Sequence, residues 1–437
     1  GELTLISRDS LGNDSNGSSA EPDISADGRF IVYASSASDL LNGDTNGFSD
    51  IFLENLNLGV RKLISTGLGV ADSNGFSFDP AISANGRYVV FHSSASNLVT
   101  DDTNSVTDVF RYDIETNSID RISTDSDGNE GNNMSVRAVI SVDGRYVAFE
   151  SDATNLVTGD TNGMRDIFIK DTLSGNTTRI ADVDCDVSFG CGISINGDGR
   201  YVLFHSVVST LVAGDTNAAY DVFVSDMVTG NITRASMDGA VEGNNASVGP
   251  EVSDDGSTVV FYSAASNLIA ADGNGFADVF RTDNPLFVPD TDGDKLWDDI
   301  ELLLGTNPNM ADSDSDGLSD YDEVHRDFDA SDYTHGIDTD PNNNDTDGDT
   351  LLDGQEVGLG LDPHVVDPGL PSVLRVSLSG TGAEVKRNYL FSAISYDGRY
   401  VAFDSTASNL VDDDTNIEDD VFLKDIDLGV LIRVSTD

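Results

Sequence analysis

The sequence of 437 residues predicts an all-β protein assembled from repeated units of four strands. A tight-turn motif and an acidic loop each recur six times, and the segments between them lack the 3.6-residue periodicity of amphipathic helices. The turn is an Asp-Gly or Asn-Gly pair between apolar runs. It recurs at intervals of 58, 58, 55, 57 and 142 residues, at Asp27, Asn85, Asp143, Asp198, Asp255 and Asp397.

Each repeat is predicted to hold four strands. Because Asp-Gly or Asn-Gly between apolar runs signals a β-hairpin, AISANGRYVVFHS at residues 81–93 is expected to form strand, turn and strand. A third strand is expected after the acidic loop, as in DVFRYD at residues 108–113, and a fourth after a second turn, as in DRIS at residues 120–123. Six such repeats predict a six-bladed β-propeller with an insertion in the fifth blade. A β-sandwich is the main alternative, although sandwiches rarely repeat their sequence so evenly.

The fourth-strand sequences outnumber the repeats by one. Seven such segments occur, beginning at Leu3, Arg61, Asp120, Thr178, Thr233, Leu374 and Ile432. In a closed propeller, one terminus completes the blade of the other terminus, so one closing strand is surplus. That strand is expected either at the edge of the ring or paired with a neighbouring molecule, because an unpaired edge is a template for such pairing.

The repeats, such as SVDGRYVAFES at residues 141–151, resemble the TolB-like, WD-like propeller repeats of bacteria. The resemblance covers most of residues 1–288 and 369–437, and leaves residues 289–368 as an inserted domain. It implies the propeller fold and says almost nothing about activity.

The charge of the chain restricts its partners. Asp and Glu number 78 against 23 Lys and Arg, for a formal net charge of -55, so the chain is expected to repel nucleic acid and anionic lipid and to attract cations. No apolar run of 18 residues is present, and the sequence starts at Gly1 without a signal peptide. We therefore expect a processed, secreted or cell-surface protein.

The two cysteines, Cys185 and Cys191, lie six positions apart. A short loop closed by a disulfide is the preferred interpretation, and a pair of buried free thiols is the alternative. Zinc is not favoured because no histidine lies nearby.

Three segments of the insertion carry acidic residues at positions 1, 3, 5, 9 and 12 and leucine at position 7, which is the ligand spacing of a calcium loop. We refer to them as ladder loops 1 (290–301), 2 (312–323) and 3 (345–356). Position 6, where glycine is preferred, holds Lys295, Gly317 and Thr350, so loops 1 and 3 are expected to be strained, to bend differently or to share ligands. The candidate ligands are Asp290, Asp292, Asp294, Leu296, Asp298 and Glu301; Asp312, Asp314, Asp316, Leu318, Asp320 and Glu323; and Asp345, Asp347, Asp349, Leu351, Asp353 and Glu356.

The segments GTNPNMADSDSDGLSDYDEV (residues 305–324) and GLDPHVVDP (residues 360–368) resemble the thrombospondin type 3 repeats of bacterial surface proteins. The resemblance implies several calcium ions along a compact segment with almost no core. By the same logic, a further site is expected at Asp338, Asp340, Asn342 and Asn344. An acidic solvated linker is the alternative, but it would not need Leu and Glu in register.

An Asp-x-Asn-x-x-x-Asp pattern precedes the third strand of every repeat, and we refer to these six segments as the sheet loops. Their oxygens are either half of a calcium shell or the side chains of Asx turns, and both possibilities stay open. The residues are Asp44, Asn46 and Asp50; Asp102, Asn104 and Asp108; Asp160, Asn162 and Asp166; Asp215, Asn217 and Asp221; Asp272, Asn274 and Asp278; and Asp414, Asn416 and Asp420.

One position after the aromatic residue of the second strand varies among repeats that are otherwise alike. It holds Ala34, His92, Glu150, His205, Tyr262 and Asp404. These residues are either an acid/base cleft on one face or simply solvated or packed positions. The sequence contains no glycine-rich phosphate loop, nucleophile elbow or zinc helix, so no catalytic set is assigned.

These features favour a calcium-binding propeller with a structural or adhesive role, which includes head-to-tail assembly into fibres through the surplus strand or the insertion. Copies of itself and cell-surface glycans or proteins are the expected partners. The alternatives are a glycan-processing lyase or hydrolase and a module that binds carbohydrate or protein on one face.

Overall fold

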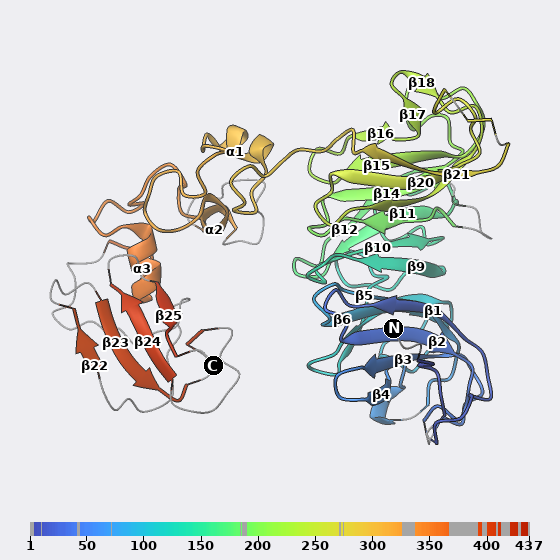
Figure 1. Ribbon diagram of the computed structural model, residues 1–437, viewed down its shortest axis with the longest axis horizontal. Helices are drawn as coiled ribbons and strands as arrows, with labels where there is room; N and C mark the ends of the chain where they lie inside the picture. Colours follow the sequence, from blue (N-terminus) through green and yellow to red (C-terminus); the bar gives the residue numbers. More distant parts are fainter. Residues whose placement is uncertain are drawn as a thin grey trace. The chain divides into compact units, whose positions relative to one another are not determined.

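The computed structural model describes two compact units, Gly1–Phe287 and Val288–Asp437 (Figure 1). The expected insertion starts at residue 289, next to this division. The described residues are 4–9, 11–41, 44–70, 72–183, 185, 190–270, 272–273, 275–325, 337–366, 392–395, 400–407, 410–411, 420–426 and 430–435.

The first unit contains five antiparallel sheets in its described residues, each with its strands in chain order. Sheets 1 to 4 have four strands each (β1–β4, β5–β8, β9–β12 and β13–β16), sheet 5 has three (β19–β21), and β17–β18 form a small hairpin. The strands are β1 Ser19–Ile24, β2 Phe30–Ser35, β3 Asp50–Asn55, β4 Val60–Leu63, β5 Ser77–Ile82, β6 Tyr88–Ser93, β7 Asp108–Asp113, β8 Ile119–Arg121, β9 Ser135–Ile140, β10 Tyr146–Ser151, β11 Asp166–Asp171, β12 Thr177–Ala181, β13 Ser194–Ile195, β14 Tyr201–Ser206, β15 Asp221–Asp226, β16 Ile232–Arg234, β17 Met237–Asp238, β18 Val241–Glu242, β19 Ser247–Val252, β20 Thr258–Ser263 and β21 Asp278–Asp283.

The second unit holds the insertion and the sheet of the sixth repeat. Sheet 6 is four-stranded, in the order β22-β23-β24-β25, and the buried Lys424 of β24 donates to the carbonyl oxygen of Gly358 at 3.0 Å. The elements are α1 Asp298–Leu304, α2 Asp320–Val324, α3 Asp353–Leu359, β22 Ser392–Ile394, β23 Tyr400–Ser405, β24 Asp420–Asp425 and β25 Leu431–Arg433.

A pair of stacked aromatic rings joins the second and third strands of every sheet. Tyr33 faces Phe52 in sheet 1, with ring centroids 5.7 Å apart. Phe–Phe pairs at 5.7–5.9 Å occupy the same register in the other five sheets. Cross-strand aromatic pairs stabilise a sheet beyond the area they bury, so the repeated Phe of the sequence fixes the register of each hairpin.

The hairpin turns connect neighbouring sheets. In the first turn, Gly28 has φ +68°, a conformation that favours glycine, and the Asp27 carboxylate accepts the N–H of Arg29 at 2.9 Å. Backbone hydrogen bonds then run from each turn to the next, as from the N–H of Ala26 to the carbonyl of Ala84 at 3.1 Å. The remaining links are Asn85 to Val142, Val142 to Gly197 and Gly197 to Asp254, at 2.8–3.1 Å.

The first strands of the five sheets line one shared cavity of about 370 Å³. Each sheet contributes to its wall through residues that include Asp23, Ile82, Val139, Ser194 and Glu251. Successive sheets that turn their first strands toward a common cavity form a β-propeller arrangement, as the repeats predict.

The N-terminal segment differs from the expected surplus strand. Residues 4–9 form no strand. The Arg61 guanidinium instead donates to the carbonyl oxygens of Ile6 and Arg8, and Ile6 packs against the apolar cluster of sheet 1. These carbonyl oxygens are bonded to a side chain rather than to a strand. The expected fourth strand at Leu374 and the turn at Asp397 lie outside the described residues.

The expected disulfide is present between Cys185 and Cys191. Both cysteines are buried and pack in a cluster with Ile167, Phe204 and Phe223 of sheets 3 and 4. Among the described residues, no helix has the length and apolar character needed to cross a membrane.

Candidate metal centres

The first carboxylate of each ladder loop shapes the turn of that loop. In ladder loop 1, the Asp290 carboxylate accepts the N–H groups of Gly293 at 2.7 Å and Lys295 at 3.0 Å. Asp312 and Asp345 accept from the corresponding N–H groups of their own loops at 2.7–3.1 Å. These bonds to backbone amides hold the loop closed.

The ninth position starts a helix in each loop. The hydroxyl of Thr291 donates to the Asp298 carboxylate at 2.7 Å, and the N–H of Thr291 donates to it at 2.8 Å. Ser313 binds Asp320, and Thr346 binds Asp353, in the same way. The Asp at position 9 also lies in the first turn of α1, α2 or α3, where the helix dipole favours a negative charge. This hydroxyl–carboxylate pair was not predicted, although a Thr or Ser at position 2 of every loop is its sequence signal.

The sixth position has left-handed backbone in all three loops. Its φ is +87° at Lys295, +104° at Gly317 and +84° at Thr350. Two of the three residues therefore hold a conformation that costs a residue with a Cβ about 1–2 kcal/mol. Loops 1 and 3 are therefore strained at Lys295 and Thr350, which is one of the three alternatives expected for them.

Successive loops are also joined through the fifth position. The Asp294 carboxylate of loop 1 accepts the N–H of Tyr321 in loop 2 at 3.0 Å. The Asp316 carboxylate of loop 2 accepts the N–H of Gly354 in loop 3 at 2.9 Å. Carboxylate oxygens of Asp316, Glu323 and Asp353 lie within 4.8 Å of one another, so loops 2 and 3 bring acidic groups to one place.

Each loop buries carboxylate oxygens that receive no hydrogen bond from the described residues. These atoms are Oδ2 of Asp292, Asp314 and Asp347 at position 3 and both side-chain oxygens of Glu301 at position 12. Glu301 and Glu323 are 0% exposed. Burial and the neighbouring aspartates raise the pKa of Glu301 to about 8 and that of Glu323 to about 10. In their ionised form these carboxylates present acceptor-only oxygens, which a hard cation would satisfy in place of the proton.

The fourth candidate group, around Asp338 and Asp340, makes contacts unlike those of the three ladder loops. The Asp340 carboxylate accepts the N–H of Asn342 at 3.1 Å, and the Asn342 amide donates to the carbonyl oxygen of Leu304 at 3.1 Å. Asp338 is buried, and the backbone oxygen of Asn344 accepts the N–H of Asp353 at 3.2 Å. These residues form a turn that packs on the end of α1 and the start of α3.

The sheet loops of sheets 1 to 4 form Asx turns. In sheet 1, the Asn46 side-chain oxygen accepts the N–H of Phe48 at 2.7 Å, and its amide donates to Asp50 at 2.8 Å. Asn104, Asn162 and Asn217 make the same two kinds of bond. In sheets 1, 2 and 4 the last Asp is buried at the start of the third strand and accepts a serine hydroxyl, as Asp50 does from Ser65 at 2.7 Å. Asn274, Asp414 and Asn416 lie outside the described residues.

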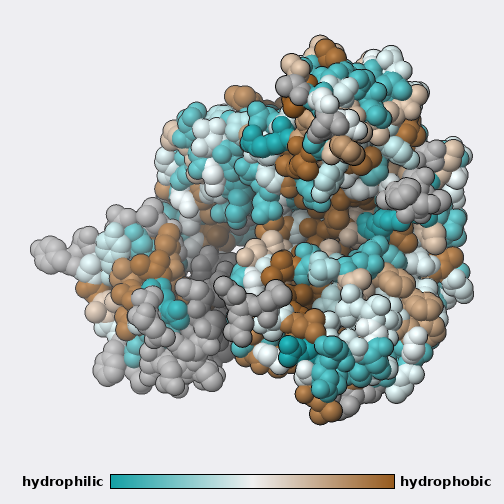
Figure 2. Space-filling model, turned by 45° about the vertical axis from the view of Figure 1, so that its right-hand side comes forward, coloured by the Kyte–Doolittle hydropathy of each residue, from teal (hydrophilic) through white to brown (hydrophobic). Residues whose placement is uncertain are grey.

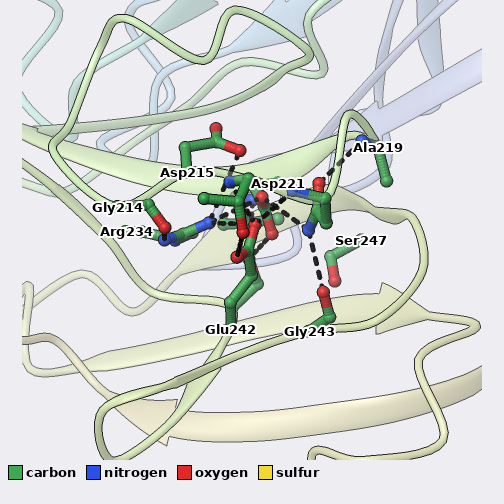
Figure 3. A network of polar contacts seen from close by, with 12 residues as sticks. Gly214, Asp215, Ala219, Asp221, Arg234, Glu242, Gly243 and Ser247 are labelled. Carbon is green, nitrogen blue, oxygen red and sulfur yellow. Dashed lines mark hydrogen bonds and ion pairs between the residues drawn. The ribbon is translucent and has the colours of Figure 1, made fainter.

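An arginine lies between the acidic groups of the sheet loops in sheets 2 to 4. Figure 3 shows Arg234 of sheet 4, whose guanidinium lies 3.0 Å from Asp221, 3.0 Å from Glu242 and 3.7 Å from Asp215. Arg179 of sheet 3 contacts Asp160, Asp166 and Asp182 at 2.6–3.2 Å, and Arg121 of sheet 2 contacts Asp101, Asp102 and Glu130 at 2.9–3.8 Å. In these sheets the chain supplies its own cation to the loop.

The varied second-strand position is partly packed. Glu150 is 0% exposed, accepts the N–H of Cys191 at 2.6 Å and pairs with Arg137 at 3.2 Å. Burial lowers the pKa of His92 to about 4, so the imidazole is neutral near pH 7. Ala34 is buried, whereas Tyr262 is 56% exposed. The contacts of Glu150 with Cys191 and Arg137 hold parts of the fold together. The N–H of Gly249 lies 3.4 Å from Nδ1 of His205.

A pocket of about 410 Å³ beside His92 was not predicted. Glu21, Asp79 and Arg137 line it, and each has positive φ, at +54°, +49° and +52°. They lie where the pairing of β1, β5 and β9 is irregular, which is the position of a β-bulge. A charged residue in the middle of a first strand is the sequence signal that could have indicated this pocket.

No family model and no curated protein matches the chain. Among solved structures, the chain is similar to TolB from Acinetobacter baumannii (17% identity, 62% of this chain and 55% of that chain, TM-score 0.35). It is also similar to the β-propeller domain of the Trilobed protease from Pyrococcus furiosus (12% identity, 96% of this chain and 86% of that chain, TM-score 0.37). A third similar structure is an oligogalacturonate lyase in complex with manganese (13% identity, 62% of this chain and 66% of that chain, TM-score 0.38). At these identities and TM-scores, the comparisons assign no activity to this chain.

Proposed function

We propose that this chain is a calcium-binding β-propeller with a structural or adhesive role, in which the inserted ladder loops hold the ions. The observation that carries the proposal is a set of buried carboxylate oxygens in loop 1, Oδ2 of Asp292 and both side-chain oxygens of Glu301, which receive no hydrogen bond from the described residues. Isolated buried charges are strongly unfavourable unless they are paired, protonated or bound to a metal.

The donor set fits calcium better than other common metals. All candidate side-chain ligands of the ladder loops are carboxylates, and Ca²⁺ prefers six to eight oxygens in a flexible geometry. Neither Cys nor His belongs to the three loops, so the sets do not suit zinc or copper. Asp290, Asp292, Asp294 and Glu301 would bind the ion of loop 1, and the corresponding residues of loops 2 and 3 would bind theirs. The ions would supply positive charge that offsets the repulsion among these carboxylates.

We further propose that sheet 6 acts as the sixth blade and completes the ring. The residue after the first Asp of the third strand is 0% exposed in sheets 1 to 4, but Val279 of sheet 5 is 63% exposed and Val421 of sheet 6 is 44% exposed. The first strands β1 and β22 are also largely exposed. Figure 2 shows that hydrophobic residues reach the surface of the molecule on the face drawn. Sheets 5 and 6 thus leave exposed an apolar residue that sheets 1 to 4 bury, and a completed six-bladed ring would bury both.

A secreted or cell-surface location agrees with this function. The disulfide favours an oxidising compartment, and low-affinity calcium modules function at the millimolar calcium concentrations found outside cells. Head-to-tail assembly is part of the proposal, because sheet 6 of one chain could cover the exposed faces of the next chain instead of its own. The partners would then be copies of this chain, together with cell-surface glycans or proteins.

Light scattering in millimolar calcium and in excess chelator tests the structural role. Calcium-dependent oligomers or fibres are expected if assembly occurs, and a compact six-bladed monomer in both conditions would remove the assembly part. Isothermal titration calorimetry on the same samples tests calcium binding itself. Absence of saturable binding at millimolar calcium would overturn the main proposal.

Recognition of a charged glycan or protein is the second candidate. The pocket at Glu21, Asp79, His92 and Arg137 favours it, because strained backbone and buried charges gather at binding sites. A glycan panel tests this candidate for both binding and turnover. Arg137→Ala is expected to reduce binding of acidic glycans, with Arg29→Ala in an exposed turn as its control.

A further inference from the structure

One register position separates sheet 1 from the other four-stranded sheets. The residue of the fourth strand that pairs with the third-strand Phe is Arg121 in sheet 2, Arg179 in sheet 3, Arg234 in sheet 4 and Arg433 in sheet 6. In sheet 1, Phe52 pairs with Leu63. The sheet that lacks this arginine therefore lacks the cation that the others place at their sheet loops.

The acidic groups remain in sheet 1. Asp44 and Asp50 correspond to Asp215 and Asp221 of sheet 4, and Asp72 corresponds to Glu242. The Thr45 hydroxyl donates to Asp72 at 2.5 Å, just as the Thr216 hydroxyl donates to Glu242 at 2.7 Å. Sheet 1 thus keeps the three carboxylates and the threonine link of sheet 4 (Figure 3), without the arginine.

The basic residues near Leu63 bind elsewhere. Arg61 contacts Glu54 and the carbonyl oxygens of Ile6, Arg8 and Leu40. Lys62 donates to Tyr112 and Asn117 in sheet 2. Leu63 packs on the apolar cluster of sheet 1. Among the described residues, no cation forms an ion pair with Asp44, Asp50 or Asp72.

A second observation points to a ligand at this place. Asp44 is 7% exposed, and its Oδ1 is buried without a hydrogen bond from any described residue. Burial, and then the charges of Asp50 and Asp72 that face Asp44, raise the pKa of Asp44 to about 6, while the backbone N–H of Asn46 donates to this carboxylate and acts in the opposite direction. Asp50 is itself 0% exposed. The hydroxyl of Ser73 donates to Asp50 at 2.9 Å and so ties the segment of Asp72 to the third strand.

We propose that Asp44, Asp50 and Asp72 bind one divalent cation of the calcium type at the place where sheets 2 to 4 use an arginine. Three carboxylates offer hard oxygen donors, and water completes the shell. The ion would tie the start of β3 to the segment that leads to β5, as each arginine does in its own sheet. The site is independent of the ladder loops, because its residues lie in the other unit.

The experiment replaces the proposed ion of sheet 1 by the arginine that sheets 2 to 4 place at their sheet loops. Bound calcium is counted by equilibrium dialysis of the full chain against 1 mM calcium and 150 mM NaCl, values of roughly extracellular order. Leu63→Arg should bind about one ion fewer than wild type and retain its thermal transition in chelator, because the guanidinium replaces the ion. Asp44→Asn should also lose about one ion. Because it lacks the stabilising guanidinium, its thermal transition in chelator should lie below that of Leu63→Arg.

Two controls keep the result interpretable. Leu63→Met preserves an apolar side chain and should bind as many ions as wild type. Glu301→Gln removes a ladder-loop ligand, so its effect on the count should add to that of Leu63→Arg. If the ladder loops bind no calcium, wild type should bind about one ion and Leu63→Arg none. A folded Leu63→Arg variant that binds as much calcium as wild type would overturn the proposed site, whatever the ladder loops bind.

Discussion

The Asp316 carboxylate accepts the N–H of Gly354 at 2.9 Å and so joins ladder loop 2 to the first turn of α3 in ladder loop 3. Asp294 and Tyr321 make the equivalent contact between loops 1 and 2. A candidate ligand in one loop is therefore positioned by the backbone of the next loop. The three loops are expected to fill with calcium cooperatively rather than one by one.

Gly354→Ala should break this link. A Cβ at this position would lie 2.6 Å from the backbone oxygen of Asp316, so the two loops must separate. We expect a loss of about 1–3 kcal/mol in the free energy of unfolding, as for other overpacked sites, and weaker calcium binding by loops 2 and 3. Calorimetry and urea unfolding measure both effects. Leu302→Ala on the exposed face of α1 is the control, and equal effects from the two variants would contradict the link.

Thr350→Gly should stabilise the calcium-free chain. Its φ of +84° is costly for a β-branched residue and favourable for glycine. The gain is expected to be about 0.5–1 kcal/mol, because the greater freedom of glycine in the unfolded chain offsets part of the relief. Urea unfolding of the second unit in chelator measures it. Thr346→Gly, which removes a hydroxyl that binds Asp353, should destabilise instead.

Calcium binding should release protons near pH 7. Burial and then Asp292 and Asp294 raise the pKa of Glu301 to about 8 in the metal-free chain, above its ordinary value of 4.5. The native state therefore binds more protons than the unfolded state between pH 4.5 and 8, so metal-free stability falls as pH rises through this window. Calcium affinity should rise over the same window because the ion displaces the proton.

Calorimetry in buffers of different ionisation enthalpy measures the released protons. Glu301→Gln should release fewer protons than wild type and bind calcium more weakly. A heat that does not depend on the buffer at pH 7 would show that Glu301 is already ionised, contrary to this prediction. Glu115→Gln, whose salt bridge to Arg87 lies in sheet 2, serves as the control.

Val279→Lys tests closure of the ring. If sheet 6 covers this exposed valine as the sixth blade, a buried lysine should prevent docking and increase the radius of gyration in small-angle scattering. The individual sheets should stay folded by circular dichroism. Leu58→Lys, at an exposed turn between β3 and β4, should change neither quantity. An unchanged radius for Val279→Lys would contradict closure through this face.

Local chemistry explains which features could be predicted from the sequence. The Asp-Gly turns and the apolar runs beside them depend on residues close in the chain, so the hairpins were expected correctly. Leu63, which stands where other repeats have an arginine, is equally visible in the sequence. However, its meaning depends on Asp72, which comes near Asp44 only in the fold.

Longer-range packing explains the features that were missed. Arg61 holds Ile6 and Arg8 against sheet 1, so the expected strand at Leu3 does not form in its described residues. The positive φ of Glu21 and Asp79 follows from bulges that no local motif indicates. The arginines that contact the sheet loops of sheets 2 to 4 lie more than ten residues along the chain from the aspartates they contact there, so the loop motif alone did not indicate them.

The most direct test of the calcium proposal uses Trp297, the only tryptophan of the chain, which lies within ladder loop 1 and caps the start of α1. Its fluorescence is followed as calcium is added to the chelator-treated full chain at constant ionic strength. We predict a saturable change in the micromolar to millimolar range, shifted to higher calcium in Glu301→Gln and in Asp292→Asn. A spectrum that stays constant up to roughly 10 mM calcium, well above the affinity range of known calcium modules, would contradict the account.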